Sequence, residues 1–257
     1  MKPKMLKCVD GSELAYHKTD GAQPGVVFLG GFRSDMTGSK AMALEEFCKE
    51  HGRQFIRFDY FGHGQSSGNF VEGTIGRWAD NAVAVLDELA GDAPQILVGS
   101  SMGGWLMLLV ALRRPQKVAA LMGIAAAPDF TELLMWDKFS EAQQAELKEK
   151  GVIDLPNCYD DEPYKITLNL IAESGEHLVL DNEIAIECPV VLIHGMLDED
   201  VPWEFSMTLN EKIASQKVRT LLVEGGDHRM SSEKHLNLIC KQLARLMGEL
   251  DQQEDAA

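Results

Sequence analysis

The feature that most constrains the fold of this chain is an alternation of short apolar runs with segments of helical period. The apolar runs have the length of strands and cover residues 25–31, 54–60, 95–101, 118–127, 189–195 and 219–226. Segments with helical spacing lie between and after them, at about 38–51, 75–90, 102–113, 203–216 and 231–249. This order is typical of the α/β class, in which a mostly parallel sheet carries helices on its faces. A predicted hairpin at Asp10-Gly11 brings the expected sheet to about eight strands.

Residues 128–187 interrupt the alternation. They contain polar, helix-leaning pieces and no run that would make a central strand. Sixty residues are too many for a plain connection between a strand and a helix. We therefore expect a core formed by residues 1–127 and 188–257, with 128–187 inserted as a small cap above the sheet.

Composition limits the partners and the location. The formal net charge is −16, with no basic run, which argues against a nucleic-acid partner because such binding depends on clustered positive charge. The longest apolar run, "WLMLLVAL", is too short for a membrane span. Five widely spaced cysteines form no metal-binding pattern, and no signal or transit peptide is recognisable. These features predict a cytoplasmic protein with free thiols.

The segment "ILVGSSMGGWLM" places a nucleophile pattern at the junction of a strand and a helix. Gly99, Ser101 and Gly103 form G-x-S-x-G, in which the strand reverses so sharply at the serine that side chains at the flanking positions would collide. Ser100 has no such framing. The alternative is that the two small serines only ease the packing of a helix against the sheet. The position of the motif favours Ser101 as a nucleophile.

A serine needs a base and an acid that orients the base. His228 follows the last predicted strand in "VEGGDHRM", on a loop that reaches the edge of the sheet. The loop after the preceding strand, "LIHGMLDEDVPW", supplies Asp198 and, as the alternative acid, Asp200. Asp227 is a poor candidate because sequence neighbours rarely face each other in the required way. The order serine, aspartate, histidine is the order found in α/β-hydrolases.

With these residues placed, the chain resembles α/β-hydrolases of the mammalian mitochondrial palmitoyl-protein thioesterase and mycophenolic acid acyl-glucuronide esterase type. The segments that carry the resemblance are "MTGSKAMALEEFCK", "IRFDYFGHGQSSG", "QILVGSSMGGWLM", "HGMLDEDVPWEFSM" and "DHRM". The resemblance implies a triad of Ser101, Asp198 and His228. It also implies an oxyanion hole made by the backbone N–H groups of Phe32 and Met102, with "FLGGF" standing where relatives have an H-G-F turn.

Other glycine-rich turns do not predict a nucleotide site. "GHGQS" lacks the third glycine of a dinucleotide motif and no helix opens directly after it, and "GSK" reverses the order that a phosphate loop requires. We expect no metal and no organic cofactor.

The expected activity is hydrolysis of carboxylic esters or thioesters of small molecules through an acyl-Ser101 intermediate. A small-molecule receptor or binding module on the same fold, a peptidase and a carbon–carbon bond hydrolase remain alternatives. The sequence does not predict an oligomeric state. We expect apolar residues to line an acyl pocket and two arginines to lie near its mouth. The apolar residues are Phe32, Met36, Met102, Met135, Trp136, Met196, Trp203 and Met230, and the arginines are Arg33 and Arg229.

Overall fold

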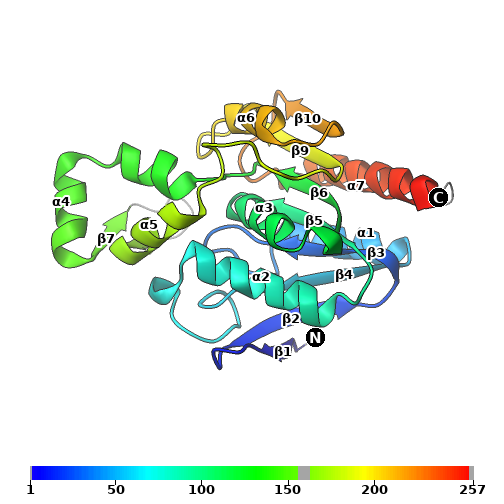
Figure 1. Ribbon diagram of the computed structural model, residues 1–257, viewed down its shortest axis with the longest axis horizontal. Helices are drawn as coiled ribbons and strands as arrows, with labels where there is room; N and C mark the ends of the chain where they lie inside the picture. Colours follow the sequence, from blue (N-terminus) through cyan, green and yellow to red (C-terminus); the bar gives the residue numbers. More distant parts are fainter. Residues whose placement is uncertain (1, 156–162, 255–257) are drawn as a thin grey trace.

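The computed structural model describes residues 2–155 and 163–254 and has one large sheet between two layers of helices (Figure 1). The eight strands of this sheet lie in the order β1-β2-β4-β3-β5-β6-β9-β10. Their bounds are β1 Lys4–Lys7, β2 Glu13–Thr19, β3 Ala22–Leu29, β4 Arg53–Phe58, β5 Gln95–Ser100, β6 Val118–Ile124, β9 Val190–Gly195 and β10 Val218–Val223. The predicted α/β-hydrolase type of sheet, mostly parallel with about eight strands, is thus confirmed.

The strand directions follow the sequence expectation. From β4 through β3, β5, β6 and β9 to β10 all neighbours run parallel. The entry hairpin is antiparallel: β1 pairs with β2, and β2 pairs with β4. Gly11 takes a φ of 84° in the hairpin turn, a conformation that glycine adopts at little cost.

Two helical layers bury opposite faces of the sheet. One layer is α1 (Ser39–Glu50) and α7 (Glu233–Glu254), and the other contains α2 (Ile75–Leu89), α3 (Met102–Arg113) and α6 (Glu204–Lys212). Successive residues of a strand pack against opposite layers. Val98 packs in the cluster with α1 and α7, whereas Leu97 packs in the cluster with α2 and α3. Short helical turns occur at η1 Phe70–Glu72 and η2 Pro115–Lys117.

The segment that follows β6 builds a separate small layer, drawn in green at one end of Figure 1. It contains a π-helical turn and two 3₁₀ turns, two short helices and a two-stranded antiparallel sheet. Their bounds are η3 Thr131–Met135, η4 Trp136–Lys138, α4 Glu141–Lys150, β7 Val152–Leu155, β8 Tyr164–Thr167, α5 Leu168–Ser174 and η5 Gly175–His177. Residues 156–162 of the expected cap lie outside the described residues. The limits of the cap at 128 and 187 stay a prediction.

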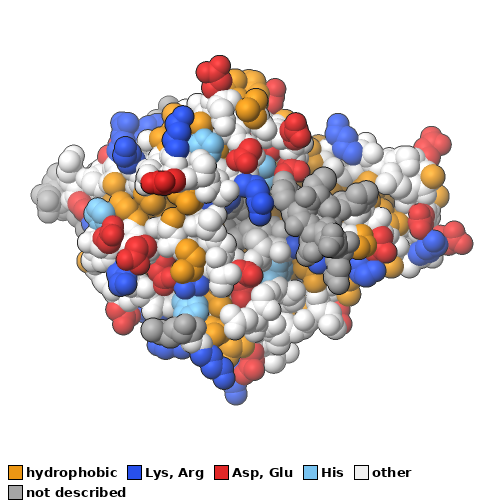
Figure 2. Space-filling model, turned by 180° about the vertical axis from the view of Figure 1, so that it is seen from behind, with side chains coloured by type: hydrophobic (Ala, Val, Ile, Leu, Met, Phe, Trp, Pro, Cys, Tyr) orange, Lys and Arg blue, Asp and Glu red, His pale blue; other side chains and the backbone are white. Residues whose placement is uncertain are grey.

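The surface charges and the helices of the described residues concern two expectations, that the protein has no nucleic-acid partner and no membrane span. Acidic and basic side chains are interspersed on the face that Figure 2 shows. No helix within residues 2–155 and 163–254 is long and apolar enough to cross a membrane. Of the five cysteines, four lie in this part of the chain, and all four are free thiols: Cys8, Cys48, Cys188 and Cys240.

Candidate active site

Ser101 occupies a strained turn between β5 and α3. Its φ of 53° and ψ of −120° are unusual for a residue with a side chain, and it is the residue that precedes the first turn of α3. The turn is fixed by neighbours, since Ser101 N–H donates to the Ile124 carbonyl at 3.0 Å and Ala127 N–H donates to the Ser101 carbonyl at 3.1 Å. Strain of this kind persists only where the surroundings determine the conformation, and it is common at active sites.

The glycines of the motif are required by close backbone contacts. A Cβ at Gly99 would lie 2.2 Å from the Gly103 carbonyl oxygen, and a Cβ at Gly103 would lie 2.1 Å from the Leu29 carbonyl oxygen. Both distances are far below van der Waals contact. Glycine is therefore required at both positions because α3 starts directly against the ends of β5 and β3.

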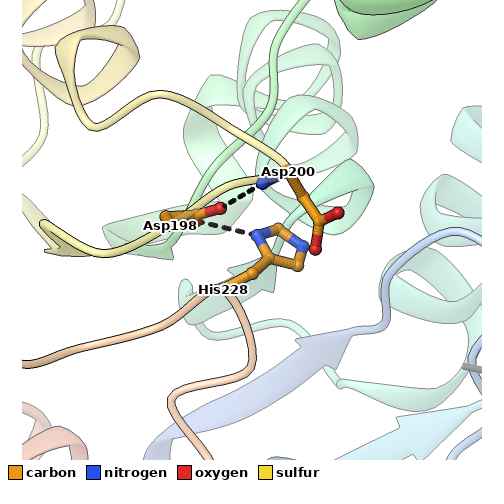
Figure 3. A group of neighbouring side chains, drawn as sticks. All are labelled: Asp198, Asp200 and His228. Atoms are coloured by element: carbon orange, nitrogen blue, oxygen red, sulfur yellow. Dashed lines mark hydrogen bonds and ion pairs between the residues drawn. The ribbon is translucent and has the colours of Figure 1, made fainter. Parts of the chain in front are cut away.

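His228 and Asp198 lie together at the same edge of the sheet, on the loops that follow β10 and β9. His228 Nδ1 is 2.8 Å from Asp198 Oδ2, and the contact is drawn in Figure 3. Because a carboxylate accepts, the Nδ1 nitrogen carries the proton and donates it. The Asp198 side chain is fully buried, whereas that of His228 is 19% exposed.

Four N–H groups surround the Asp198 carboxylate. Oδ2 accepts from His228 and from His194 Nε2 at 3.1 Å, and Oδ1 accepts from the backbone of Asp200 at 3.0 Å and of Val201 at 2.8 Å. Burial alone would raise the pKa of this carboxyl, but the hydrogen bonds from His194 and His228 hold it well below its usual range. Asp198 is therefore ionised at physiological pH.

Asp200, the alternative acid, has a different position. Its backbone N–H supports Asp198, and its exposed side chain lies beside the His228 ring in Figure 3. Asp198, Asp200 and His228 present atoms within 4.8 Å of one another, a spacing that a metal ion would also accept. However, four N–H donors already fill the lone-pair positions of Asp198. The arrangement of Asp198 suits an acid that orients a histidine better than a metal ligand.

A cavity of about 230 Å³ opens at this edge and brings several predicted residues together. Ser101 and His228 line it with residues of the loop between β3 and α1, the start of α1 and the loop after β10. These are Phe28, Gly31, Phe32, Ser34, Asp35, Gly38, Ser39, Lys40, Ala41, Ser100, Arg229 and Ser231. The cavity thus joins three stretches of the chain, within residues 28–41, 100–101 and 228–231.

Two backbone N–H groups at this edge have no acceptor among the residues that the structure describes. Within the described part of the chain, no hydrogen bond uses the N–H of Phe32 or of Met102. Met102 is the first residue of α3, where N–H groups have no partner within the helix. Both groups are available to a ligand next to Ser101.

Lys40 also lines the cavity, and the sequence analysis did not predict this residue as part of the site. Its ammonium donates to the carbonyl of Arg229, next to His228. Burial, with the charge of Arg229, lowers the pKa of Lys40 to about 8. The sequence carries one signal for it, the lysine in "TGSK", a segment that reverses the order of a phosphate loop.

The remaining predicted substrate contacts are dispersed. The side chains of Met36, Met102 and Met230 are buried in the core at 1%, 0% and 0% exposure, so they do not line the cavity. Met135 and Trp136 pack against a small apolar cluster, against which Phe32 also packs; its buried members are Leu147, Ile153, Ile166 and Ile171.

Three further predicted contacts lie nearer the surface. Met196 is 39% exposed, and Trp203 is half-buried just before α6. The Arg33 guanidinium lies over the rings of Phe70 and Tyr164, at 5.2 and 5.4 Å from their centres, and so faces β8. These three residues do not line the cavity that contains Ser101.

Comparison with known proteins identifies close relatives over most of the chain. A family model described as alpha/beta hydrolase fold matches residues 26–157. The mitochondrial palmitoyl-protein thioesterase ABHD10 of Mus musculus is 45% identical over 227 residues, which are 88% of this chain and 76% of the relative. The Homo sapiens protein of the same name is 42% identical over 94% of this chain and 78% of its own length.

Solved structures agree with the sequence relatives. Alpha/beta hydrolase domain-containing protein 10 from mouse superposes with a TM-score of 0.90 at 41% identity, over 97% of this chain and 100% of the other. Est1E from Butyrivibrio proteoclasticus, with ferulic acid bound, gives a TM-score of 0.79 at 24% identity over 97% of this chain and 100% of that one, which is a likeness of fold alone.

The relatives correct one expectation and settle the family. The predicted cytoplasmic location is wrong, because five relatives at 41–45% identity are named mitochondrial proteins. Acidic composition and free thiols do not distinguish one reducing compartment from another, so they gave no information on the cellular location. The match to the family model and the identity to these relatives together show that the chain belongs to the α/β-hydrolase fold family.

Proposed function

We propose that the protein is a serine hydrolase that cleaves carboxylic esters or thioesters through an acyl-Ser101 intermediate. The observation that carries the proposal is the buried Asp198–His228 hydrogen bond at the cavity that also contains Ser101. Relatives that are 41–45% identical are named palmitoyl-protein thioesterases, which supports an acyl ester or thioester as the substrate.

The first half of the reaction forms the acyl-enzyme. Ser101 Oγ attacks the carbonyl carbon while His228 Nε2 takes its proton, and Asp198 keeps the other proton on Nδ1 and stabilises the imidazolium. The carbonyl oxygen becomes an oxyanion, which accepts hydrogen bonds from the N–H groups of Phe32 and Met102. The C–O or C–S bond then breaks, and His228 returns its proton to the leaving alcohol or thiol.

The second half releases the acid. Water attacks the acyl carbon, His228 takes a proton from the water, and the ester bond to Ser101 breaks as Oγ recovers a proton. The residues already described suffice for both halves, because His228 alternates between base and acid and Asp198 stays ionised throughout.

The acyl chain is proposed to lie between Phe32 and the described residues of the small layer that follows β6, among them Met135 and Trp136. The Phe32 ring packs edge-on against Phe70, Trp78 and Phe130, with centroids 4.9 to 5.9 Å apart. The cluster against which Met135 and Trp136 pack lies against the same ring. An apolar chain beside these residues would gain about 0.8 kcal/mol or less for each CH₂ removed from water.

The leaving group is proposed to occupy the polar side of the cavity. Lys40 and Arg229 place two cations there, against one carboxylate at Asp35, which already accepts two hydrogen bonds from Thr37. Two further carboxylates act on Lys40 from outside the lining, Asp198, which is held by four N–H donors, and Asp227, which accepts from the Met230 N–H. A leaving group with a carboxylate or phosphate would therefore be favoured over a neutral one.

A fluorophosphonate probe and a substrate panel test the proposal. The wild type should be labelled and Ser101→Ala should not, while Ser100→Ala, which removes the neighbouring hydroxyl, should still be labelled. With p-nitrophenyl esters and acyl thioesters of graded length, kcat/KM should rise over the first several carbons. A burst without steady turnover would instead indicate a receptor, and peptide cleavage faster than ester cleavage would indicate a peptidase.

A further inference from the structure

The turn that carries the Phe32 N–H group is held on both sides. The Gly31 carbonyl accepts from the backbone N–H of Ser34 at 3.1 Å and from its hydroxyl at 2.8 Å. In a trans peptide the carbonyl and the following N–H point in opposite directions. Because Ser34 holds the Gly31 carbonyl, the Phe32 N–H of the same peptide points to the other side, where it has no acceptor among the described residues.

The next peptide of the turn is held by a histidine from another loop. The backbone N–H of Arg33 donates to His63 Nε2 at 3.2 Å. Arg33 has a φ of 56°, a left-handed conformation that residues with a side chain rarely adopt. Such a conformation persists only when its surroundings determine it, and the contact with His63 is the hydrogen bond that fixes this peptide.

The partners of His63 determine its protonation. Nδ1 lies 3.1 Å from the Phe61 carbonyl, which only accepts, so Nδ1 carries the proton. Nε2 faces the N–H of Arg33, which only donates, so Nε2 has none. Burial lowers the pKa of His63 to about 4, with the nearby charge of Arg33 acting in the same direction. The ring is therefore neutral at physiological pH and remains an acceptor.

Aromatic neighbours fix the ring in place. His63 is 4% exposed and packs edge-on against Tyr60, Phe70 and Trp78, with ring centroids 5.6, 5.1 and 5.1 Å away. The nitrogen that accepts from Arg33 thus has one direction, set by the loop after β4 and by α2. This loop is the "FGHGQSSG" segment, to which the reaction has assigned no role.

We propose that His63 is a positioning residue for the oxyanion hole. By accepting the N–H of Arg33 it fixes the turn in which the N–H of Phe32 faces the carbonyl oxygen of a substrate on Ser101. The inference rests on the proposed function, because an oxyanion forms only if Ser101 attacks an acyl group.

Two substitutions separate the hydrogen bond from packing. In His63→Gln the side-chain oxygen reaches the position of Nε2 and is able to accept from Arg33. In His63→Asn the shorter amide reaches only the position of Nδ1, so it donates to Phe61 but leaves the N–H of Arg33 without an acceptor. Both variants lose the ring and its aromatic contacts, so a role in packing alone would affect them alike.

The assay measures kcat, KM and the affinity for a trifluoromethyl ketone, whose adduct with the serine carries an oxyanion. In His63→Asn we expect kcat and inhibitor affinity to fall together by at least tenfold, towards the roughly 10²–10³-fold cost of deleting an oxyanion donor, with KM little changed. In His63→Gln both should stay within a few-fold of the wild type.

Several outcomes would overturn the inference: wild-type kcat and inhibitor affinity in His63→Asn, equal losses in both variants, or a change confined to KM. Failure of the proposed function would look different. It would appear as turnover that persists in Ser101→Ala, or as no turnover in the wild type, independently of any change at His63.

Discussion

Acidification should destabilise the protein through His63, and the size of the effect follows from its pKa. Burial lowers this pKa from the ordinary 6.5 to about 4 in the folded protein. At a pH between these two pKa values, the unfolded chain binds a proton at this position and the folded protein does not. Stability therefore falls as the pH is lowered through this window, because protonation favours the unfolded state.

The magnitude is large for one side chain. At 1.36 kcal/mol per pKa unit, the difference between 6.5 and about 4 corresponds to about 3 kcal/mol of unfolding free energy lost between pH 7 and pH 4. The ring is 4% exposed, so solvent screens little of this effect. Other groups also titrate in this range, so the contribution of His63 must be isolated by comparison with a variant that lacks it.

The comparison uses urea unfolding of the wild type and His63→Gln at pH 7, 6, 5 and 4. Glutamine does not titrate, and the other ionisable groups are common to both proteins. The stability advantage of the wild type should shrink by about 3 kcal/mol from pH 7 to pH 4, with most of the change below pH 6.5. A difference that stays constant within about 0.5 kcal/mol over this range would refute the assignment of a neutral, buried His63.

Four other substitutions test the site. Asp198→Asn should lower kcat by about 10⁴ because the tautomer of His228 is no longer fixed, whereas Asp200→Asn should have a mild effect; the reverse result would make Asp200 the acid. Gly103→Ala should lower the unfolding free energy by about 1–3 kcal/mol or more, measured by urea unfolding, since its Cβ would lie 2.1 Å from a carbonyl oxygen. Lys40→Met should raise KM about tenfold for esters with an anionic leaving group and leave KM for neutral esters unchanged; equal changes for both would contradict the proposed leaving-group site.

The central sheet was predictable because its strands are continuous apolar runs. Strands such as β5 and β9 are buried on both faces, so their sequences carry the signal without alternation. The small sheet of β7 and β8 was not predicted. Each of these strands has four residues and mixes polar with apolar side chains, as in "VIDL" and "YKIT", which gives too short a pattern to distinguish from a loop.

Backbone constraints were easier to infer than side-chain directions. The glycines around Ser101 indicated a sharp turn, and the structure contains one. Met36 and Met230 were placed correctly on loops at the edge of the sheet, yet both side chains are directed into the core. A position on a loop does not determine which way its side chain points, so the predicted lining of the acyl pocket was only partly informative.

Contacts between distant segments were not accessible from the sequence. The ammonium of Lys40 and the carbonyl of Arg229 are 189 residues apart in the chain, and no local pattern relates them. His63 and Arg33 are 30 residues apart, and the glycine-rich segment around His63 reads as a structural turn. In each case the sheet order brings together loops that the sequence separates.

Three histidines lie close to the reaction site, and their partners show why they are not interchangeable. His63 has its proton on Nδ1 and uses Nε2 to accept from the backbone. His194 has its proton on Nε2, shared between the Asp198 carboxylate and the Val201 carbonyl, and its Nδ1 contacts the Ser206 hydroxyl at 2.7 Å. Each therefore has both ring nitrogens engaged.

His228 differs from the other two in one respect. Its Nδ1 is bound to Asp198, while its Nε2 has no hydrogen-bond partner anywhere in residues 2–155 and 163–254. A base must have a nitrogen that is free to take a proton, and at this edge of the sheet His228 meets that requirement. The carboxylate of Asp198 thus occupies Nε2 of His194 and gives His228 the tautomer that the proposed attack of Ser101 requires.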